Sequence, residues 1–258
     1  MAKFAANLTM LFTELPFMER FEAAKNAGFQ AVEFLFPYDF EPDLIAGKLH
    51  ELGLEQALFN MPPGDWDAGE RGLAALPGRE EEFRNSVDTA LCYAEALKCK
   101  KVHAMSGIMD SAYSYEQHVE TFISNIRYAA DKFAEKDILL LVEPLNTKAA
   151  PGYFVAHQRE AVELIKKVER PNVKLQFDVF HAQIMDGDIT TMIRDLATDI
   201  GHIQIASIPD RHEPDEGELN YPHIYNTLDE VNYSGWIGCE YNPRGRTLEG
   251  LNWVKPYL

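Results

Sequence analysis

The ten residues Asp137-Ile138-Leu139-Leu140-Leu141-Val142-Glu143-Pro144-Leu145-Asn146 hold the most informative pattern in the chain: five consecutive apolar residues, then a carboxylate and a proline. A short apolar run of this kind is typical of a strand buried on both faces, as in parallel sheets. Pro144 has no N–H to donate to a neighbouring strand, so the strand ends there. Glu143 is therefore expected at the C-terminal end of a buried strand, which in a closed parallel barrel is the end where catalytic residues lie.

The same unit of strand and helix recurs along the chain. Besides the stretch around Glu143, the apolar runs predict strands at 4–8, 31–35, 56–59, 102–105, 173–177, 203–206 and 236–239. Helical periodicity predicts helices at 16–27, 43–52, 80–97, 116–133, 159–168, 189–196 and 222–231, with a last one from Leu248. Eight such units in about 250 residues predict a single (β/α)₈ TIM barrel that spans residues 1–258. An open dinucleotide-binding sheet is the weaker interpretation, because the first turn, residues 7–11, contains no glycine.

Composition and charge exclude several classes of protein. Hydrophobic residues make up 46% of the 258 residues, and no apolar run approaches the roughly 18 residues that cross a bilayer. The first residues lack the layout of a signal peptide, so we expect a cytoplasmic protein. Its three cysteines have neither disulfide nor metal-knuckle spacing. Asp and Glu outnumber Lys and Arg by 41 to 24, and the resulting charge of −17 disfavours binding to nucleic acids and to anionic membranes.

Four neighbouring strands carry an oxygen-bearing side chain at or near their ends: Glu143, Asp178, Gln204 and Glu240. Neighbouring strand ends converge on the axis of a barrel, so these side chains can meet around one point. Three carboxylates that crowd together raise one another's pKa, and a divalent cation relieves this repulsion. An all-oxygen set suits Mg²⁺ or Mn²⁺ better than zinc. The sequence therefore predicts a metal site formed by these four residues.

Two glutamates at such a site suggest a proton-transfer reaction. A substrate whose carbonyl and neighbouring hydroxyl both bind the ion becomes acidic at the hydroxyl-bearing carbon, and the cation stabilises the resulting enediolate. One carboxylate can then remove the proton while the other returns it to the adjacent carbon. This chemistry is an aldose–ketose type of isomerisation, with Glu143 and Glu240 as the catalytic pair.

Six segments together resemble the hydroxypyruvate isomerase family, within the xylose isomerase-like TIM barrels. They are FAANLTMLFTELPFMERF (4–21), FNMPPGDWDAGERGLAALPGRE (59–80), LLVEPLN (140–146), QFDVFHAQIMDGD (176–188), HIQIASIPDRHEPDEGELNY (202–221) and GWIGCEYNPRG (235–245). The resemblance implies that Glu143 and Glu240 are the acid–base pair and that Glu143, Asp178, Gln204 and Glu240 surround the metal. It implies conversion of hydroxypyruvate to 2-hydroxy-3-oxopropanoate through a cis-enediol. Related sugar 3-epimerases have a histidine where this chain has Gln204, which leaves the identity of the metal and the need for it open.

Further residues are candidates for binding the substrate. His181 follows Asp178 by three residues, so it could contact the substrate, and the related epimerases use a histidine at the matching place. Arg211 is a reasonable partner for a substrate carboxylate, because a guanidinium binds it with two hydrogen bonds. Arg71 and Arg244 compete for this role, and the sequence does not choose among the three.

Other polar and aromatic residues are expected to support the site. We expect His103 and His202 inside the barrel with Glu33 and Asn60 as partners, and Trp66 and Phe36 as walls of a small pocket.

Three alternatives to hydroxypyruvate isomerisation remain. The nearest is an isomerase or epimerase of the same barrel class that acts on 2-oxo-tetronate or on a free ketose. A metal-dependent phosphodiesterase resembling the AP endonucleases is remote, because strand three ends on Asn60 rather than on histidine. A catalytically silent sugar-binding barrel would have no reason to hold three converging acids.

The C-terminal residues 253–258 and the proline-rich loops could serve a homo-oligomer contact.

Overall fold

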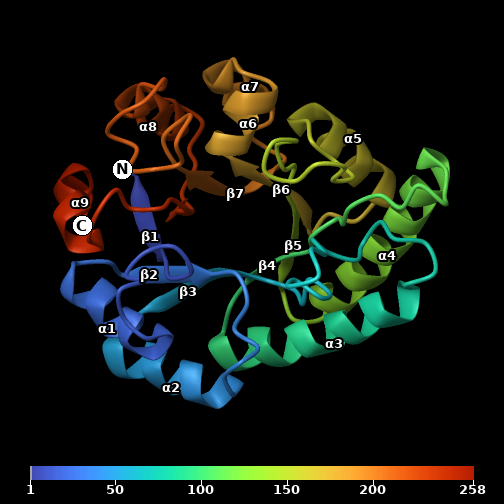
Figure 1. Ribbon diagram of the computed structural model, residues 1–258, viewed down its shortest axis with the longest axis horizontal. Coiled ribbons are helices and arrows are strands. Elements are labelled where there is room, and N and C mark those ends of the chain that lie inside the picture. Colours follow the sequence, from blue (N-terminus) through green and yellow to red (C-terminus); the bar gives the residue numbers. More distant parts are fainter. Residues whose placement is uncertain (1) are drawn as a thin grey trace.

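The computed structural model describes residues 2–258 and contains a closed barrel of eight parallel strands. The strands follow one another in chain order around the barrel (Figure 1), and β8 pairs with β1 to close it. They are β1 (Lys3–Asn7), β2 (Ala31–Phe34), β3 (Glu55–Asn60), β4 (Lys101–His103), β5 (Leu139–Val142), β6 (Val173–Asp178), β7 (Ile200–Ile205) and β8 (Trp236–Cys239). The predicted (β/α)₈ fold class is confirmed.

Helices surround the barrel and connect successive strands (Figure 1). They are α1 (Phe17–Asn26), α2 (Pro42–Leu52), α3 (Glu80–Leu97), α4 (Tyr115–Ala134), α5 (Gln158–Val168), α6 (Val179–Met185), α7 (Ile189–Asp195), α8 (Tyr221–Glu230) and α9 (Thr247–Gly250), followed by the 3-10 helices η1 (Leu251–Trp253) and η2 (Lys255–Tyr257). Seven of the α-helices match predicted ones within two residues at each end. The short helix α6 was not predicted, and it carries His181.

Helix ends follow local sequence signals. Ser114 accepts a hydrogen bond from the backbone N–H of Gln117 at the start of α4, and the Gln117 side chain accepts one in return from the N–H of Ser114. This reciprocal pair satisfies two N–H groups that the helix leaves free. Gly53 ends α2 in the left-handed conformation, with φ of +60°, which glycine adopts without steric cost.

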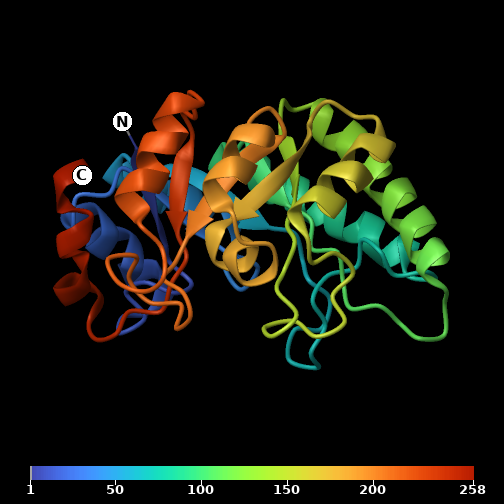
Figure 2. The same cartoon turned by 90° about the horizontal axis from the view of Figure 1, so that it is seen from above.

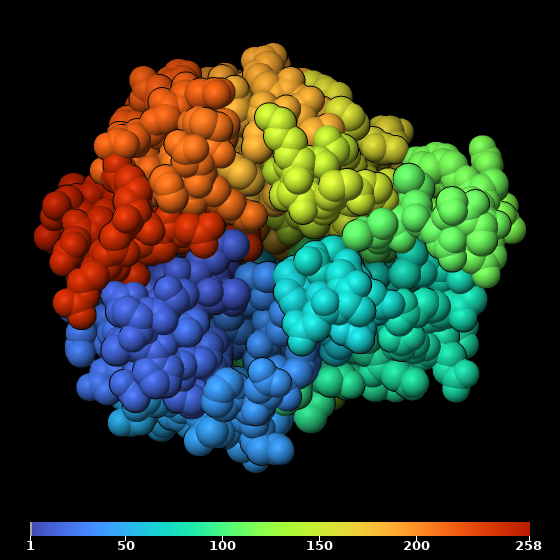
Figure 3. Space-filling view, viewed as in Figure 1, coloured from blue at the N-terminus to red at the C-terminus, as the bar shows by residue number. Residues whose placement is uncertain are grey.

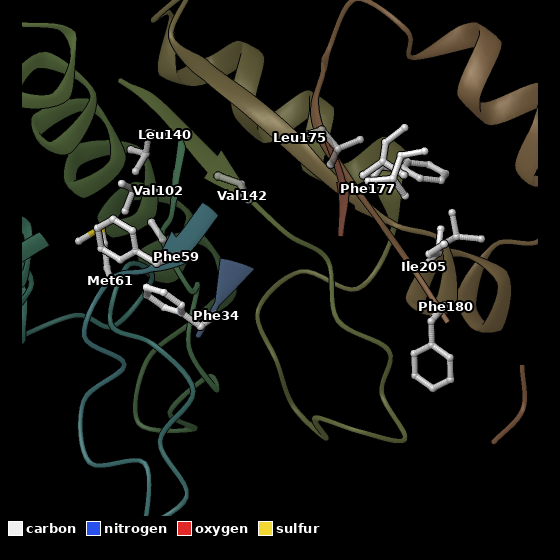
Figure 4. Packing of buried hydrophobic residues seen from close by; sticks show 14 of the residues in the cluster. Phe34, Phe59, Met61, Val102, Leu140, Val142, Leu175, Phe177, Phe180 and Ile205 are labelled. Atoms are coloured by element: carbon white, nitrogen blue, oxygen red, sulfur yellow. The ribbon is translucent and has the colours of Figure 1, made fainter. Parts of the chain in front are cut away.

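The hydrophobic core lies between the barrel and the surrounding helices. Figure 4 shows part of it, including Phe34, Phe59, Val142 and Phe177 from four strands. A smaller cluster of Ala5, Ala31 and Ala57 is separate from it. Because successive side chains of a strand face opposite sides, the residues between the core positions face the barrel axis. Many of these are polar and buried, as Asn7, Glu33, His103, Gln176 and His202 are.

The loops that follow β3, β5 and β7 extend from one end of the barrel (Figure 2). This is the end at which the strands terminate, so the loops cover the predicted catalytic residues. Within residues 2–258, none of the helices has the length and apolar character of a membrane span.

Candidate active site

The predicted acids lie together at the C-terminal ends of their strands. Glu143 directly follows β5, Asp178 is the last residue of β6, and Glu240 directly follows β8. Strand register places Asp178 beside Gln204 and Gln204 beside Gly238. All four predicted ligands are at most 6% exposed.

A cavity of about 250 Å³ opens above these residues. Its lining includes Glu143, His181, Arg211 and Glu240, whereas Asp178 and Gln204 lie beneath its surface. The rest of the lining comes mainly from Met10, Leu35, Asn60, Trp66, Arg71, Met105, Leu145, Ala149 and Ala150. Figure 3 shows this face of the molecule hollowed near its centre, between the loops after β1, β3 and β5.

Arg211 lies between two of the acids. Its Nη2 atom is 3.5 Å from Asp178 Oδ2 and 3.4 Å from Glu240 Oε2. The guanidinium packs over the Phe180 ring, with Cζ 4.8 Å from the ring centroid. Its own backbone is held by the N–H of Asn242, which donates to the Arg211 carbonyl over 2.8 Å. The arginine thus supplies a positive charge at the centre of the acidic group.

Burial and mutual repulsion raise the pKa of each acid. Burial raises the pKa of Glu240 to about 8 and that of Asp178 to about 6, although Arg211 opposes both shifts. Burial also raises the pKa of Glu143 well above its ordinary value, and the charge of Glu240 is the next largest cause. Two neighbouring carboxyl groups with raised pKa values can divide the roles of proton acceptor and proton donor near neutral pH.

A chain of hydrogen bonds holds Glu143 from inside the barrel. Gln176 Nε2 donates to Glu143 Oε2 over 3.0 Å and to Gln204 Oε1 over 2.6 Å. Gln204 Nε2 in turn donates to Glu33 Oε1 over 2.9 Å. His202 Nε2 lies 2.8 Å from Glu33 Oε2, as expected for a histidine inside the barrel with Glu33 as its partner. The network leaves Glu143 Oε1 buried without a hydrogen-bond partner among the described residues.

The tautomer of His181 follows from its neighbour Asn146. The backbone N–H of Asn146 donates to His181 Nδ1 over 3.0 Å. Because Nδ1 accepts a hydrogen bond, the neutral ring carries its hydrogen on Nε2, which lies 3.5 Å from Asp178 Oδ2. Burial, reinforced by Arg211, lowers the pKa of His181 well below its ordinary value, so the ring is neutral.

These contacts fit a metal ion only in part. Glu143, Asp178 and His181 could hold an ion, because their ligand atoms lie within 4.8 Å of one another. The unpartnered Glu143 Oε1 suits such a role, but one Asp178 oxygen accepts from the Phe180 N–H, and His181 Nε2 carries a hydrogen. The Oε1 atom of the predicted ligand Gln204 accepts a hydrogen bond from Gln176 Nε2 over 2.6 Å, which leaves one lone pair of that oxygen for an ion. Glu240 is not part of the group of three, and it faces Arg211.

The sequence analysis did not identify two polar residues that hold Glu143 and His181 in place. Gln176 precedes Asp178 by two residues, so strand alternation places both side chains on the same face, and this signal could have revealed it. Asn146 ends the stretch around Glu143 and fixes the ring of His181. Of the competing arginines, Arg71 lines the cavity, whereas Arg244 pairs with Glu213, Asp215 and Glu216 outside it.

Comparison of the sequence with known proteins shows to which family the chain belongs. The profile of the xylose isomerase-like TIM barrel matches residues 21–257. The chain belongs to the xylose isomerase-like TIM barrels. Within this family it is similar over its full length to the 2-oxo-tetronate isomerase of Pectobacterium atrosepticum, with 55% identity over 258 residues that cover 100% of this chain and 98% of the relative. It is 46% identical to the hydroxypyruvate isomerase of Escherichia coli K12, over 100% of both chains.

A solved structure supports the same fold. The chain matches a crystal structure from Brucella melitensis, named AP endonuclease, family 2, with a TM-score of 0.98 and 60% identity over 100% of this chain and 99% of that one. The predicted resemblance is confirmed, and so is the prediction of an enzyme, because the curated relatives are isomerases by name.

Proposed function

We propose that this protein isomerises small hydroxy-oxo acids by moving a proton between adjacent carbons through a cis-enediol, with Glu143 and Glu240 as the acid–base pair. One observation carries the proposal: both glutamates line one small cavity, and burial raises the pKa of each. General acid–base catalysis needs one protonated and one ionised group at the operating pH, which such a pair provides.

The reaction needs no oxidant, because its atoms and electrons balance within the substrate. One glutamate removes a proton from the hydroxyl-bearing carbon, and the electron pair forms the carbon–carbon double bond while the carbonyl oxygen gains a proton. The glutamate pair then returns a proton to the former carbonyl carbon, and the former hydroxyl becomes the new carbonyl as it gives up its own proton, which balances the proton gained by the first carbonyl oxygen. Each assisted proton transfer contributes about 10²–10⁴-fold to the rate.

Arg211 and His181 are the proposed substrate-binding residues at the reacting atoms. Arg211 lines the cavity beside Glu240, so its positive charge favours the negative charge that develops on the enediolate oxygens. His181 is neutral and carries hydrogen on Nε2, so it can donate a hydrogen bond to a substrate oxygen without adding a charge.

We propose separately that the site can hold a divalent metal ion. Mg²⁺ or Mn²⁺ would be held by the carboxylates of Glu143 and Asp178 and would supply Lewis-acid stabilisation of the enediolate. The proton transfers are assigned to the protein side chains alone, because Arg211 already provides a cation next to Asp178 and Glu240.

Two substrates of different length are compatible with this chemistry. The resemblance favours hydroxypyruvate, with 2-hydroxy-3-oxopropanoate as product. The four-carbon 2-oxo-tetronate is the second candidate, because the relatives at 55%, 47% and 48% identity are named 2-oxo-tetronate isomerases. Measurement of kcat/KM for both acids and for a free ketose tests the proposal. It fails if neither acid is isomerised or if the neutral ketose is preferred.

A phosphodiesterase that cleaves DNA at abasic sites is the remote alternative, in keeping with the name of the Brucella protein. The formal charge of −17 opposes it, and among residues 2–258 only one group of three His, Cys, Asp or Glu side chains brings its ligand atoms within 4.8 Å of one another. Incubation with abasic-site DNA and Mg²⁺ or Mn²⁺ distinguishes the two functions, and we expect no cleavage.

A further inference from the structure

Two arginines line the cavity, and they differ in what already binds them. The Nη2 atom of Arg211 faces Asp178 and Glu240 at 3.5 and 3.4 Å. Arg71 has no carboxylate partner among the described residues. Its Nη1 atom donates to the backbone carbonyls of Trp66 at 3.1 Å and Glu70 at 2.7 Å. Within residues 2–258 these two bonds use only Nη1, so the Nε and Nη2 edge of Arg71 is available to bind a carboxylate through two parallel hydrogen bonds.

The guanidinium of Arg71 is also held in place before any substrate arrives. Its Cζ lies 3.7 Å from the centroid of the Trp66 ring, and Phe36 packs edge-on against that ring with centroids 5.0 Å apart. Stacking on an indole covers one face of the cation and limits its rotamers. Such an arrangement reduces the entropy that is lost when a ligand binds.

The loop that carries Arg71 is anchored on both sides of it. The Gly72 N–H donates to the Pro63 carbonyl over 2.8 Å, and Gly72 pairs with Ser106 in an isolated bridge. A side chain at Gly72 would place its Cβ 2.2 Å from the Met105 carbonyl oxygen, at φ of +109°, so this close approach requires glycine. On the other side, Glu70 accepts a hydrogen bond from the Asp65 N–H and forms an ion pair with Arg79.

The charges of the cavity determine where a substrate carboxylate can lie. Glu143 and Glu240 repel it, and Arg211 is already engaged by acidic neighbours. We propose that Arg71 binds the substrate carboxylate and makes the site select oxo-acids over neutral ketoses of the same length. This inference rests on the proposed function, and it assigns Arg71 to the carboxylate and Arg211 to the reacting oxygens.

The test compares an acid with its neutral counterpart in three variants. Arg71→Met removes the charge, Arg71→Lys keeps the charge but loses the two-pronged geometry, and Arg244→Gln removes an arginine that does not line the cavity. Kinetics are measured with hydroxypyruvate and with dihydroxyacetone, in which a hydroxymethyl group replaces the carboxylate. Circular dichroism checks that each variant is folded.

We expect Arg71→Met to raise KM for hydroxypyruvate about 10- to 100-fold with little change in kcat, because the lost interaction is present in both ground and transition states. Turnover of dihydroxyacetone should change less than about twofold, and Arg71→Lys should fall between Arg71→Met and the unmodified protein. Arg244→Gln should leave both reactions unchanged. A KM for hydroxypyruvate that changes less than about threefold in Arg71→Met, or an equal loss with both substrates, overturns the inference.

Binding without turnover separates this inference from the proposed function. Calorimetry measures the binding of glycerate and of glycerol to each variant. These two compounds differ only in the carboxylate, and neither has a carbonyl group, so neither can isomerise. If glycerate binding is weakened in Arg71→Met even though no oxo-acid is turned over by the unmodified protein, the anion site stands and the proposed function fails. If glycerate binds both proteins equally, or does not bind the unmodified protein, Arg71 is not the carboxylate-binding residue.

Discussion

The substitution Glu240→Gln is expected to abolish isomerisation and, above neutral pH, to stabilise the folded protein. Glu240 is 6% exposed, and burial raises its pKa from 4.5 to about 8, with Arg211 opposing the shift. Folding therefore favours the protonated carboxyl group. The stability that this preference contributes is complete below about pH 4.5, and it is lost as the pH rises through about 8. Glutamine has nearly the same shape and cannot ionise, so the variant avoids this loss.

The size of the effect follows from the difference between the two pKa values. One pKa unit corresponds to about 1.4 kcal/mol, so a shift from 4.5 to about 8 gives a gain on the order of 3–5 kcal/mol near pH 8. This is an upper limit, because the amide also loses the attraction of Arg211, 3.4 Å away. At pH 5.5 the gain should be much smaller, since the carboxyl group of the folded protein is then protonated.

Urea denaturation followed by circular dichroism at pH 5.5, 7 and 8.5 measures this difference, in buffer with a chelator so that no metal contributes. Glu249→Gln, which replaces an exposed carboxylate, is the matched control and should show no such trend. A stability difference between Glu240→Gln and the unmodified protein that does not grow from pH 5.5 to 8.5 would refute the reasoning.

Three further predictions follow from the same contacts. Glu143→Gln should lower kcat by at least about 10²-fold with an unchanged circular dichroism spectrum, and near-normal activity would contradict the two-carboxylate mechanism. Gln204→Leu removes the hydrogen bonds that link Gln176 to Glu33. We expect kcat to fall about tenfold and the dependence of kcat on pH to shift. An unchanged dependence on pH would show that the network does not position Glu143. Dialysis against EDTA should lower kcat, because the Lewis-acid contribution of a bound ion is lost, but it should not abolish turnover, because Arg211 still supplies a cation at the site. Complete loss of activity that added Mg²⁺ or Mn²⁺ restores would show that the ion is essential.

Much of the fold could be predicted because hydrophobic periodicity and chain breakers are local signals. The strand β5 ends at Val142, just before Glu143 and Pro144, as the proline predicted. The missed helix α6 begins at the residue directly after β6, so no loop or chain breaker separates the two elements and no local signal marks its start. Asp178 serves both elements: it is the last residue of the strand, and its side chain accepts a hydrogen bond from the Phe180 N–H at the start of the helix.

The convergence of the acids could also be predicted, but the partners of each side chain could not. Strand ends in a barrel must meet, so Glu143, Asp178 and Glu240 were expected together. The orientation of the Gln204 amide depends on Gln176 and Glu33, which come from other strands and whose registers the sequence does not give. The choice among arginines depends on the paths of long loops, and neither hydrophobic periodicity nor turn residues specify those paths.

The central claim is that two glutamates transfer a proton within a hydroxy-oxo acid, and proton NMR in D₂O tests it most directly. Hydroxypyruvate is incubated with the purified protein, with Glu143→Gln or with Glu240→Gln, while its hydroxymethyl signal and the product are followed. The account predicts deuterium uptake and product formation with the unmodified protein, and loss of product with either variant. Product formation at a normal rate in either variant would contradict the account. It would also be contradicted if the unmodified protein caused neither deuterium exchange nor product formation with hydroxypyruvate or with 2-oxo-tetronate.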